Sequence, residues 1–361
     1  MTVPTPPQEI LIRYCSSPSV AKVTVLGQGN INDTFLVRTE KQVFVLQRIN
    51  DQVFPSPQLL IDNLQQLTRH LASRPDTARQ RWEEAVLVPA LDGSLSVLDS
   101  RGSMWRALSY IKDSITVSRV DSPLLAEQCG WALGHFHKRL IGLDVQKMHL
   151  PLPGFHQLTG YLRHYDQLTT HDLPQHSTDI RFCLEAIRNK RESALSLERM
   201  LARGDIQQRI IHGDPKVANV LFDRDSHLAV CLIDLDTVGP GLLHHDLGDC
   251  LRSACNTAGE DSDQTQIKFD LDLCRIVLKG YFQEADKLLT PIDRRLLYDG
   301  LKAITFELGL RFFADYLQGG IYFKCQTPEE TLHRAVVQFS LLQDIVKRKN
   351  AFLAIIPLGA V

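Results

Sequence analysis

Residues 211–239 contain the residue types that the transfer of a phosphoryl group requires, in a suitable order. Asp214 is followed by a lysine and an asparagine within five positions, and a further aspartate ends the apolar run that comes next. In such a site one carboxylate deprotonates the attacking hydroxyl, an amide and a second carboxylate hold Mg²⁺ on the phosphates of ATP, and a cation offsets the transferred charge. We therefore predict an ATP-dependent kinase with catalytic residues Asp214 and Lys216 and metal ligands Asn219 and Asp234.

Each of these residues also has a simpler alternative role. An aspartate in a Gly-Asp-Pro sequence commonly caps a helix or orders a turn, and a lone lysine is usually a surface residue. The combination of Asp214, Lys216 and Asn219 at these spacings favours catalysis instead. Because Asp234 follows the apolar residues 229–233, we expect it to emerge from a buried strand into a cleft. A carboxylate there is costly unless it is paired or bound to a metal ion.

Three neighbouring residues are expected to support the site without contacting the substrate. His212 opens the sequence His-Gly-Asp. Asp236 could be a second metal ligand or could order its loop, and we favour the ordering role. Asp246 follows two histidines at the start of a predicted helix, where we expect it to cap the helix or hold the backbone of residues 212–219. The two histidines could suggest a metal site, but capping and nearby carboxylates account for them.

A glycine-containing turn near the N-terminus is the candidate nucleotide-binding loop. The residues Gly27-Gln-Gly29-Asn30 separate two predicted strands. Backbone N–H groups in such a turn could cover phosphates, although any hairpin favours glycine. The turn becomes informative because it lies where a kinase nucleotide-binding hairpin belongs. We therefore predict that Gly27, Gly29 and Asn30 contact ATP.

The third predicted strand has no lysine at the position where kinases hold the nucleotide phosphates. Its sequence ends in Phe44-Val-Leu-Gln47-Arg48. Arg48 shares a strand face with Phe44, and its guanidinium fork could bind the α- and β-phosphates. Gln47, on the opposite face, is the rival candidate. The helix that follows also lacks a glutamate, and Asp62 is the nearest acidic partner for Arg48.

The elements that must position these residues fall into two groups. Strands are expected at 23–26, 34–38, 42–49, 86–88 and 104–111, with one helix at 58–72. Helices are expected at 124–140, 178–200, 269–282, 291–317 and 328–349, with one hairpin at 220–223 and 228–233. This pattern predicts an α+β fold with two lobes. Residues 1–110 would form a nucleotide-binding lobe with an antiparallel sheet and one helix, and residues 111–361 a larger helical lobe with the catalytic loop and the acceptor pocket.

Composition narrows the possible partners. With 361 residues and 44% hydrophobic content, the chain can bury a core large enough for two lobes. A net charge of −2 gives no reason to expect nucleic acid or an anionic membrane surface as partner. The eight cysteines include no CxxC pair and several lie in apolar runs, so we expect small core residues in a reducing cytosol. No signal peptide or membrane span is visible, which predicts a cytoplasmic protein.

The motifs resemble those of the aminoglycoside phosphotransferase and choline kinase superfamily, which has a protein-kinase-like fold. Within it, the chain resembles the N-acetylhexosamine 1-kinases most. The matching strings are Gly29-Asn-Ile-Asn-Asp-Thr-Phe35, Val45-Leu-Gln-Arg-Ile-Asn50 with Val53-Phe54, His212-Gly-Asp with Lys216-Val and Asn219-Val-Leu-Phe222, Ile233-Asp-Leu-Asp-Thr-Val238, Glu307-Leu-Gly-Leu-Arg-Phe-Phe-Ala-Asp-Tyr-Leu317 and Tyr322-Phe-Lys324. The resemblance extends over nearly the whole chain and implies the same roles for Asp214, Asn219 and Asp234.

The resemblance also implies a sugar hydroxyl as acceptor, the anomeric hydroxyl of a hexose or N-acetylhexosamine. The candidate substrate contacts are Asp33, Arg311, Asp315 and Tyr322. Arg311 and Asp315 are four residues apart on one predicted helix, so an intrahelical ion pair is the alternative. Two other readings remain open. The acceptor could be an aminoglycoside, choline or homoserine, or the missing strand lysine could mark a degenerate kinase that binds nucleotide without transferring phosphate.

Overall fold

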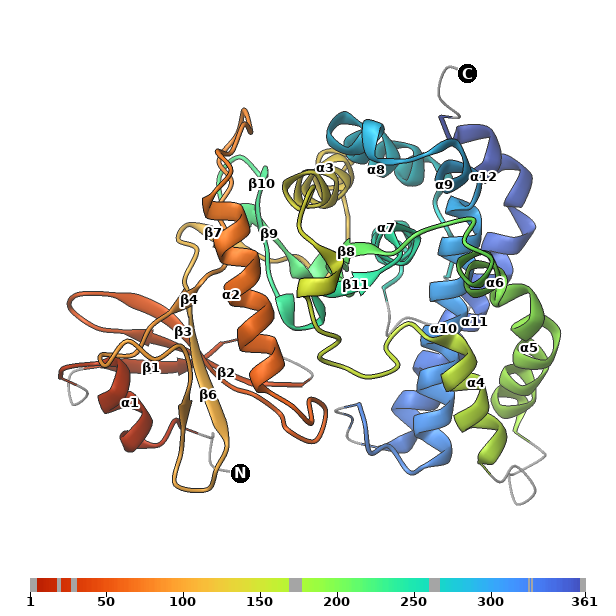
Figure 1. The fold of residues 1–361 in the computed structure, drawn as a ribbon. Helices are drawn as coiled ribbons and strands as arrows, with labels where there is room; N and C mark the ends of the chain where they lie inside the picture. Colours follow the sequence, from red (N-terminus) through yellow and green to blue (C-terminus); the bar gives the residue numbers. More distant parts are fainter. Residues whose placement is uncertain are drawn as a thin grey trace.

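The computed structural model describes residues 5–17, 21–26, 31–168, 177–259, 267–323, 325 and 327–357. The chain forms two lobes, with the N-terminal strands on one side and most helices on the other (Figure 1). The N-terminal lobe is built on an antiparallel sheet and the C-terminal lobe is largely helical. The predicted α+β fold class is thus confirmed.

The sheet of the N-terminal lobe has the strand order β1-β2-β3-β6-β4, with β5 also paired to β6. Its strands are β1 (Lys22–Val25), β2 (Asp33–Arg38), β3 (Val43–Arg48), β4 (Leu87–Val88), β5 (Val97–Leu98) and β6 (Met104–Ser109). All neighbouring strands are antiparallel. The five predicted strands are confirmed. The two-residue strand β5 was not predicted, because so short a segment carries no alternation.

Two helices pack against this sheet, where we predicted one. α1 (Gln8–Tyr14) buries Ile10 and Tyr14 against Phe44 and Trp105 on the outer face of the sheet. α2 (Gln58–Ala72) is the predicted helix. Its Leu64, Leu67 and Leu71 join the large core of the C-terminal lobe. The prediction of a single helix was wrong because a seven-residue helix offers too few turns for a helical period.

The two lobes are joined by more than the connector after β6. β7 (Ser114–Ile115) pairs with β9 (Val220–Asp223), which pairs with β10 (Ala229–Leu232). The backbone N–H of Glu83, in the segment before β4, donates to the carbonyl oxygen of Val230 at 2.7 Å. The hairpin before Asp234 is therefore fixed from both lobes.

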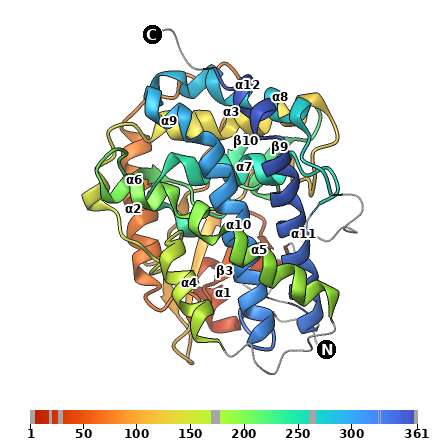
Figure 2. The ribbon, with the colours of Figure 1, turned by 90° about the vertical axis from the view of Figure 1, so that its right-hand side faces the viewer.

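The C-terminal lobe is organised around long helices, and Figure 2 shows α10 running through its centre. The helix α10 packs against α7, α11 and α5, and α3 packs against α8. The helices are α3 (Pro123–Arg139), α4 (Leu158–Gln167), α5 (Thr178–Ala194), α6 (Ser196–Ala202), α7 (Leu243–Ala254), α8 (Leu271–Ala285), α9 (Pro291–Arg295), α10 (Leu297–Leu317), α11 (Pro328–Lys347) and α12 (Lys349–Ile355). At Gly130, in α3, an added Cβ would meet the carbonyl oxygen of Val277 at 1.9 Å, so only glycine permits this approach.

Two of the predicted helices are each divided in two. The breaks lie at Leu195, between α5 and α6, and at Leu296, between α9 and α10. The predicted helix 328–349 corresponds to α11, and the separate helix α12 that follows Arg348 was not predicted. Hydrophobic periodicity continues through each break, so the sequence pattern did not reveal it. The helix α4 was missed altogether.

The remaining sequence expectations concern cysteines and membranes. The cysteines are all free, and all but Cys325 are buried, which confirms that they pack as core residues. Within the described ranges, none of the helices combines the length and apolar character needed to cross a bilayer.

Candidate active site

A short two-stranded sheet positions the predicted catalytic loop. β8 (Arg209–Ile211) pairs with β11 (Gly239–Gly241), so the residues after β8 lie beside those before β11. The Thr237 hydroxyl donates to the carbonyl oxygen of His212 at 2.8 Å, which closes this arrangement. The segments 212–219 and 234–238, which are separated in the sequence, are thus neighbours in space.

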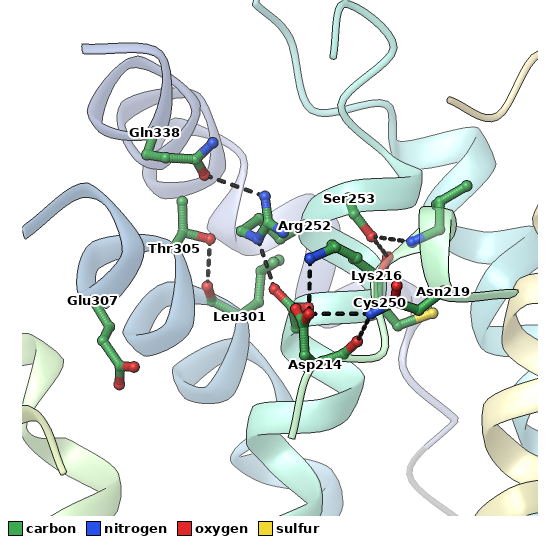
Figure 3. A network of polar contacts seen from close by, with 12 residues as sticks. Asp214, Lys216, Asn219, Cys250, Arg252, Ser253, Leu301, Thr305, Glu307 and Gln338 are labelled. Carbon is green, nitrogen blue, oxygen red and sulfur yellow. Dashed lines mark hydrogen bonds and ion pairs between the residues drawn. The ribbon is translucent and has the colours of Figure 1, made fainter. Parts of the chain in front are cut away.

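Asp214 lies at the centre of a small hydrogen-bonded group (Figure 3). The Lys216 ammonium donates to Asp214 Oδ2 at 2.7 Å. Asn219 Nδ2 donates to the same oxygen at 3.1 Å and to the Asp214 carbonyl oxygen at 2.7 Å. Burial opposes ionisation of Asp214, but the charge and hydrogen bond of Lys216 outweigh it and lower its pKa. Asp214 is therefore an ionised carboxylate, able to accept a proton.

Asp234 adopts a left-handed backbone conformation with φ of 65°, which aspartate tolerates better than most residues. The residue is exposed to solvent on one side, but protein atoms surround its carboxylate closely enough to desolvate it. Desolvation and the carboxylates of Asp236 and Asp214 together raise the pKa of Asp234 to about 7. Such a concentration of negative charge favours a bound cation.

The donor set fits Mg²⁺, which prefers a few hard oxygen ligands from protein. Since Asn219 uses Nδ2 for its bonds to Asp214, its carbonyl oxygen Oδ1 is the atom left for a cation. The described residues contain no group of three or more His, Cys, Asp or Glu side chains suited to a metal ion. A cation at Asn219 and Asp234 would therefore complete its coordination with phosphate oxygens and water.

The loop that carries Asp214 is held from behind by Asp246. This carboxylate is fully buried and accepts the backbone N–H groups of His212 at 2.7 Å and Gly213 at 2.8 Å. It also bonds His137 Nε2 at 2.8 Å. These bonds place Asp246 behind the loop, as expected. His137 was not predicted, since a histidine within a helix has no sequence signal of its own.

The His212 ring links the two site segments. Its Nε2 lies 3.0 Å from the carbonyl oxygen of Ile233, and the backbone N–H of Asp214 lies 3.3 Å from its Nδ1. The first contact requires a proton on Nε2 and the second an unprotonated Nδ1. Desolvation lowers the pKa of His212, which favours this neutral form.

Asp236 connects the C-terminal lobe with the N-terminal sheet. Its buried carboxylate forms an ion pair with Arg106 of β6 and accepts the Asn32 amide at 2.6 Å. Gln47 Oε1 accepts Arg106 Nε at 3.0 Å and Nη2 at 2.8 Å. Asp236 thus orders the junction of the lobes. Asn32 and Arg106 were missed, because nothing in the sequence shows that β6 contributes a charged group to this interface.

Arg48 does not share this environment. It lies on the same strand face as the buried Phe44 and Leu46, which pack towards α1, and it forms an ion pair with Asp33. Our prediction that Asp62 is its partner was wrong, since Asp62 accepts from Gln58 at 2.9 Å. The placement of Arg48 does not favour a role in ATP binding. The candidate nucleotide-binding residues Gly27, Gly29 and Asn30 lie outside the described residues.

Arg311 of α10, a predicted substrate contact, is surrounded by aromatic rings. The centroids of Phe155, Tyr161, Tyr322 and Phe323 lie 5.3–5.5 Å from its guanidinium carbon. The guanidinium also donates to the Tyr322 hydroxyl at 3.3 Å. Burial alone would lower the pKa of Arg311, but Tyr161, Tyr322 and Glu307 raise it, so the cation is permanent.

The alternative pairing of Arg311 with Asp315 is wrong. The Asp315 carboxylate instead accepts the backbone N–H groups of Ile321 at 2.9 Å, Tyr322 at 2.7 Å and Phe323 at 3.2 Å. It thereby fixes the turn that carries two of the rings around Arg311. Asp315 is almost fully buried, so the structure assigns it this ordering contact.

His156 and Glu307 connect α10, the helix of Arg311, with the catalytic loop and were not predicted. His156 Nδ1 lies 3.0 Å from Glu307 Oε1, and its Nε2 lies 2.7 Å from the carbonyl oxygen of Gly213. Both partners are acceptors, so the ring must donate from both nitrogens as an imidazolium. Burial alone would lower the pKa of His156, but Glu307 outweighs it and raises the pKa. Glu307 is the first residue of the segment 307–317 that resembles the N-acetylhexosamine 1-kinases, and nothing else in the sequence pointed to it.

A second buried polar network lies behind Lys216 (Figure 3). Arg252 Nε donates to Asp249 Oδ1 at 2.8 Å, and its Nη1 contacts Gln338 Oε1 at 3.5 Å. The Ser253 hydroxyl accepts the backbone N–H of Val217 at 3.1 Å. Ser253, near the end of α7, therefore supports the far end of the catalytic loop, while Asp246, in the first turn of the same helix, supports its start.

Comparison with solved structures places this architecture among known kinases. A microcompartment-associated aminopropanol kinase is similar with a TM-score of 0.65, 15% identity and coverage of 98% of both chains. An aminoglycoside phosphotransferase from Alicyclobacillus acidocaldarius has a TM-score of 0.62 and 15% identity over 98% of this chain and 96% of that one. A spectinomycin phosphotransferase, solved with ADP and its antibiotic, has a TM-score of 0.57 and 13% identity over 95% and 100%.

These similarities confirm the protein-kinase-like fold. At the level of sequence, the model of the phosphotransferase enzyme family matches residues 22–277, which is more than half of the chain. The match includes β1 to β6, the catalytic loop and α7, and so the whole of the site around Asp214. The chain therefore belongs to the phosphotransferase enzyme family and is a small-molecule phosphotransferase.

Proposed function

We propose that this protein is an ATP- and Mg²⁺-dependent kinase that transfers the γ-phosphoryl group to a hydroxyl of an uncharged sugar. The proposed acceptor is an N-acetylhexosamine or hexose, at its anomeric position. The observation that carries the proposal is the group formed by Asp214, Lys216 and Asn219, with Asp234 beside it. These side chains have the types and the proximity that phosphoryl transfer requires.

The roles follow from the contacts. Asp214, an ionised carboxylate held by two donors, orients the acceptor hydroxyl and takes its proton. Lys216, hydrogen-bonded to the base, offsets charge on the transferred group. Asn219 Oδ1 and Asp234 would hold Mg²⁺, which would offset negative charge on the phosphates. Most of the rate enhancement in such a site comes from positioning and electrostatics.

The charge of the acceptor side supports an uncharged acceptor. Arg311 carries a permanent, nearly buried positive charge. The carboxylates four residues before and after it on the same helix are already engaged, Glu307 by His156 and Asp315 by backbone N–H groups. A cationic acceptor such as an aminoglycoside or choline would meet an unfavourable field here, whereas sugar hydroxyl and carbonyl oxygens can accept from a guanidinium.

The narrower choice of N-acetylhexosamines rests on the resemblance of residues 307–317 and of the segment around Tyr322. Aromatic side chains beside a polar cation form the kind of surface on which sugar C–H groups and hydroxyls can both be satisfied. The rings around Arg311 supply such a surface.

The test is ADP release from ATP and Mg²⁺ with a panel of acceptors. The panel contains hexoses, N-acetylhexosamines, aminoglycosides, choline, aminopropanol and homoserine. We expect turnover above background only with the sugars, and the largest kcat/KM with an N-acetylhexosamine. Turnover restricted to a cationic acceptor would keep the kinase chemistry and overturn the sugar assignment. Tight nucleotide binding with no turnover on any acceptor would instead support a degenerate kinase.

A further inference from the structure

The N-terminal lobe lacks a cation on β3 at the strand face that meets the C-terminal lobe. Gln47 occupies that face, and the only basic residue of the strand, Arg48, lies on the other. Directly opposite Gln47, in the register of β3 and β6, is Arg106. Side chains directly opposite each other in an antiparallel pair lie side by side on the same face of the sheet. Arg106 therefore brings a positive charge to the place that the β3 residue leaves neutral.

Arg106 is only partly satisfied by the protein. The residue is 1% exposed, and its Nε and Nη2 atoms bond Gln47 Oε1, with Nη2 also bonding Asp236. Its third nitrogen, Nη1, is buried without a hydrogen-bond partner among the described residues. Leaving a buried charged donor unpaired costs free energy. A guanidinium whose Nε and Nη2 are engaged and whose Nη1 has no partner in the described part of the chain is prepared to receive a further oxygen ligand at Nη1.

Two observations relate Arg106 to the proposed phosphate site. Arg106 forms an ion pair with Asp236, which lies two residues after the proposed Mg²⁺ ligand Asp234. Asn32 also donates a hydrogen bond to Asp236, and it lies two positions after residues 27–30, the candidate nucleotide-binding residues, in the sequence. Nucleotide phosphates bound through a metal ion at Asp234 would therefore lie on the side of the N-terminal lobe where Arg106 meets Asp236.

We infer that Arg106 binds the nucleotide phosphates in place of a β3 lysine, with Gln47 as the residue that positions its guanidinium. This inference rests on the proposed kinase function. Arginine suits the task because its planar fork can bind protein on one edge and phosphate oxygens on the other. Asp236 takes the place of the acidic residue that pairs with the β3 lysine in other kinases. Because Asp236 belongs to the C-terminal lobe, Arg106 takes part both in phosphate binding and in the junction of the lobes.

The competing explanation is that Arg106 only joins the lobes through Asp236. The two explanations differ in how affinity depends on phosphate. A phosphate-binding arginine affects ADP and leaves adenosine unchanged, whereas a structural ion pair affects both ligands equally or neither. The comparison of these two ligands is therefore the basis of the test.

The variants remove the charge without leaving its partner buried and unpaired. In the double variant Arg106→Met/Asp236→Asn both charges are neutralised together. The triple variant adds Gln47→Lys, which returns an ammonium to the strand position opposite residue 106. The matched control is Arg48→Met, on the other face of the same strand. Circular dichroism and thermal unfolding verify that each variant is folded before binding is measured.

Affinities for ADP and adenosine are measured by isothermal titration calorimetry. We expect the double variant to bind ADP about 10- to 100-fold more weakly, as for loss of a charge-assisted hydrogen bond, with adenosine affinity unchanged. The triple variant should recover part of the loss, and Arg48→Met should match the wild type. Unchanged ADP affinity in the double variant, or equal losses for ADP and adenosine, would overturn the inference. Failure of the wild-type protein to bind either ligand would overturn the proposed function and the inference with it.

Discussion

His156 Nε2 donates to the carbonyl oxygen of Gly213 at 2.7 Å, one residue before the proposed catalytic base. The same ring bonds Glu307 of α10 through Nδ1 at 3.0 Å. Because both contacts require a protonated nitrogen, the charged imidazolium ties the acceptor side of the C-terminal lobe to the catalytic loop. The position of Asp214 thus depends on the protonation state of a buried histidine.

This contact predicts a pH-dependent stability. The pKa of His156 is raised above its ordinary value of 6.5, so its contribution is complete below about pH 6.5 and is lost as pH rises through the raised pKa. We expect His156→Gln to destabilise the protein by about 2 kcal/mol at slightly acid pH and by less at alkaline pH. Urea unfolding across this range measures the difference. The exposed His149→Gln is the control, and a penalty independent of pH would contradict the imidazolium assignment.

Asp214→Asn tests the assignment of the base. The amide keeps the shape of the side chain but cannot accept a proton, so kcat should fall by about 10²- to 10⁴-fold. ADP affinity should change little, because this residue faces the acceptor hydroxyl. The assays are steady-state turnover and calorimetry, with Asp225→Asn, in the exposed turn between β9 and β10, as control. Wild-type activity in Asp214→Asn would rule out its role as the base.

The raised pKa of Asp234 predicts how Mg²⁺ binding depends on pH. A carboxylate with a pKa of about 7 is partly protonated in neutral solution, and a metal ion must displace that proton. Apparent Mg²⁺ affinity in the presence of ADP should therefore rise about tenfold per pH unit below pH 7 and level off above it. Calorimetric titration at several pH values tests this. The Asp234→Asn variant should bind Mg²⁺ weakly without this dependence; an identical pH profile in that variant would exclude Asp234 as the titrating ligand.

Arg311 is predicted to act on the acceptor and not on the nucleotide. Replacing its fork by the single ammonium of Arg311→Lys keeps the charge but disturbs the bonds to Tyr322 and Glu307. We expect KM for the sugar to rise about tenfold, equivalent to one lost charged hydrogen bond. The ADP affinity should stay at the wild-type value. Equal losses for sugar and nucleotide would show a general structural role for Arg311.

The local sequence was sufficient for the catalytic segment, since Asp214, Lys216 and Asn219 lie within six residues and a short loop brings them together. Long β-strands and amphipathic helices were likewise predictable, because their periodicity repeats over several turns or pairs. The end points of helices were not, as shown by the break at Leu296. Periodicity gives the type of an element better than its limits.

The parts of the site that join distant segments could not be predicted. Arg106 and Asp236 are 130 positions apart, and His156 and Glu307 are 151 apart. Their contacts depend on strand register and on lobe packing, neither of which a single sequence displays. The choice between Arg48 and Gln47 was open for the same reason: alternation assigned them to opposite faces of β3, but not which face meets the C-terminal lobe.

The most direct test of the account is phosphorus NMR of the product formed from ATP, Mg²⁺ and an N-acetylhexosamine. The account predicts a new phosphate ester whose phosphorus is coupled to the anomeric proton, and its absence when Asp214→Asn replaces the wild-type protein. An ester on another hydroxyl would contradict the proposed position. No ester on any sugar, together with phosphorylation of a cationic acceptor, would contradict the account of the acceptor side as a site for uncharged sugars.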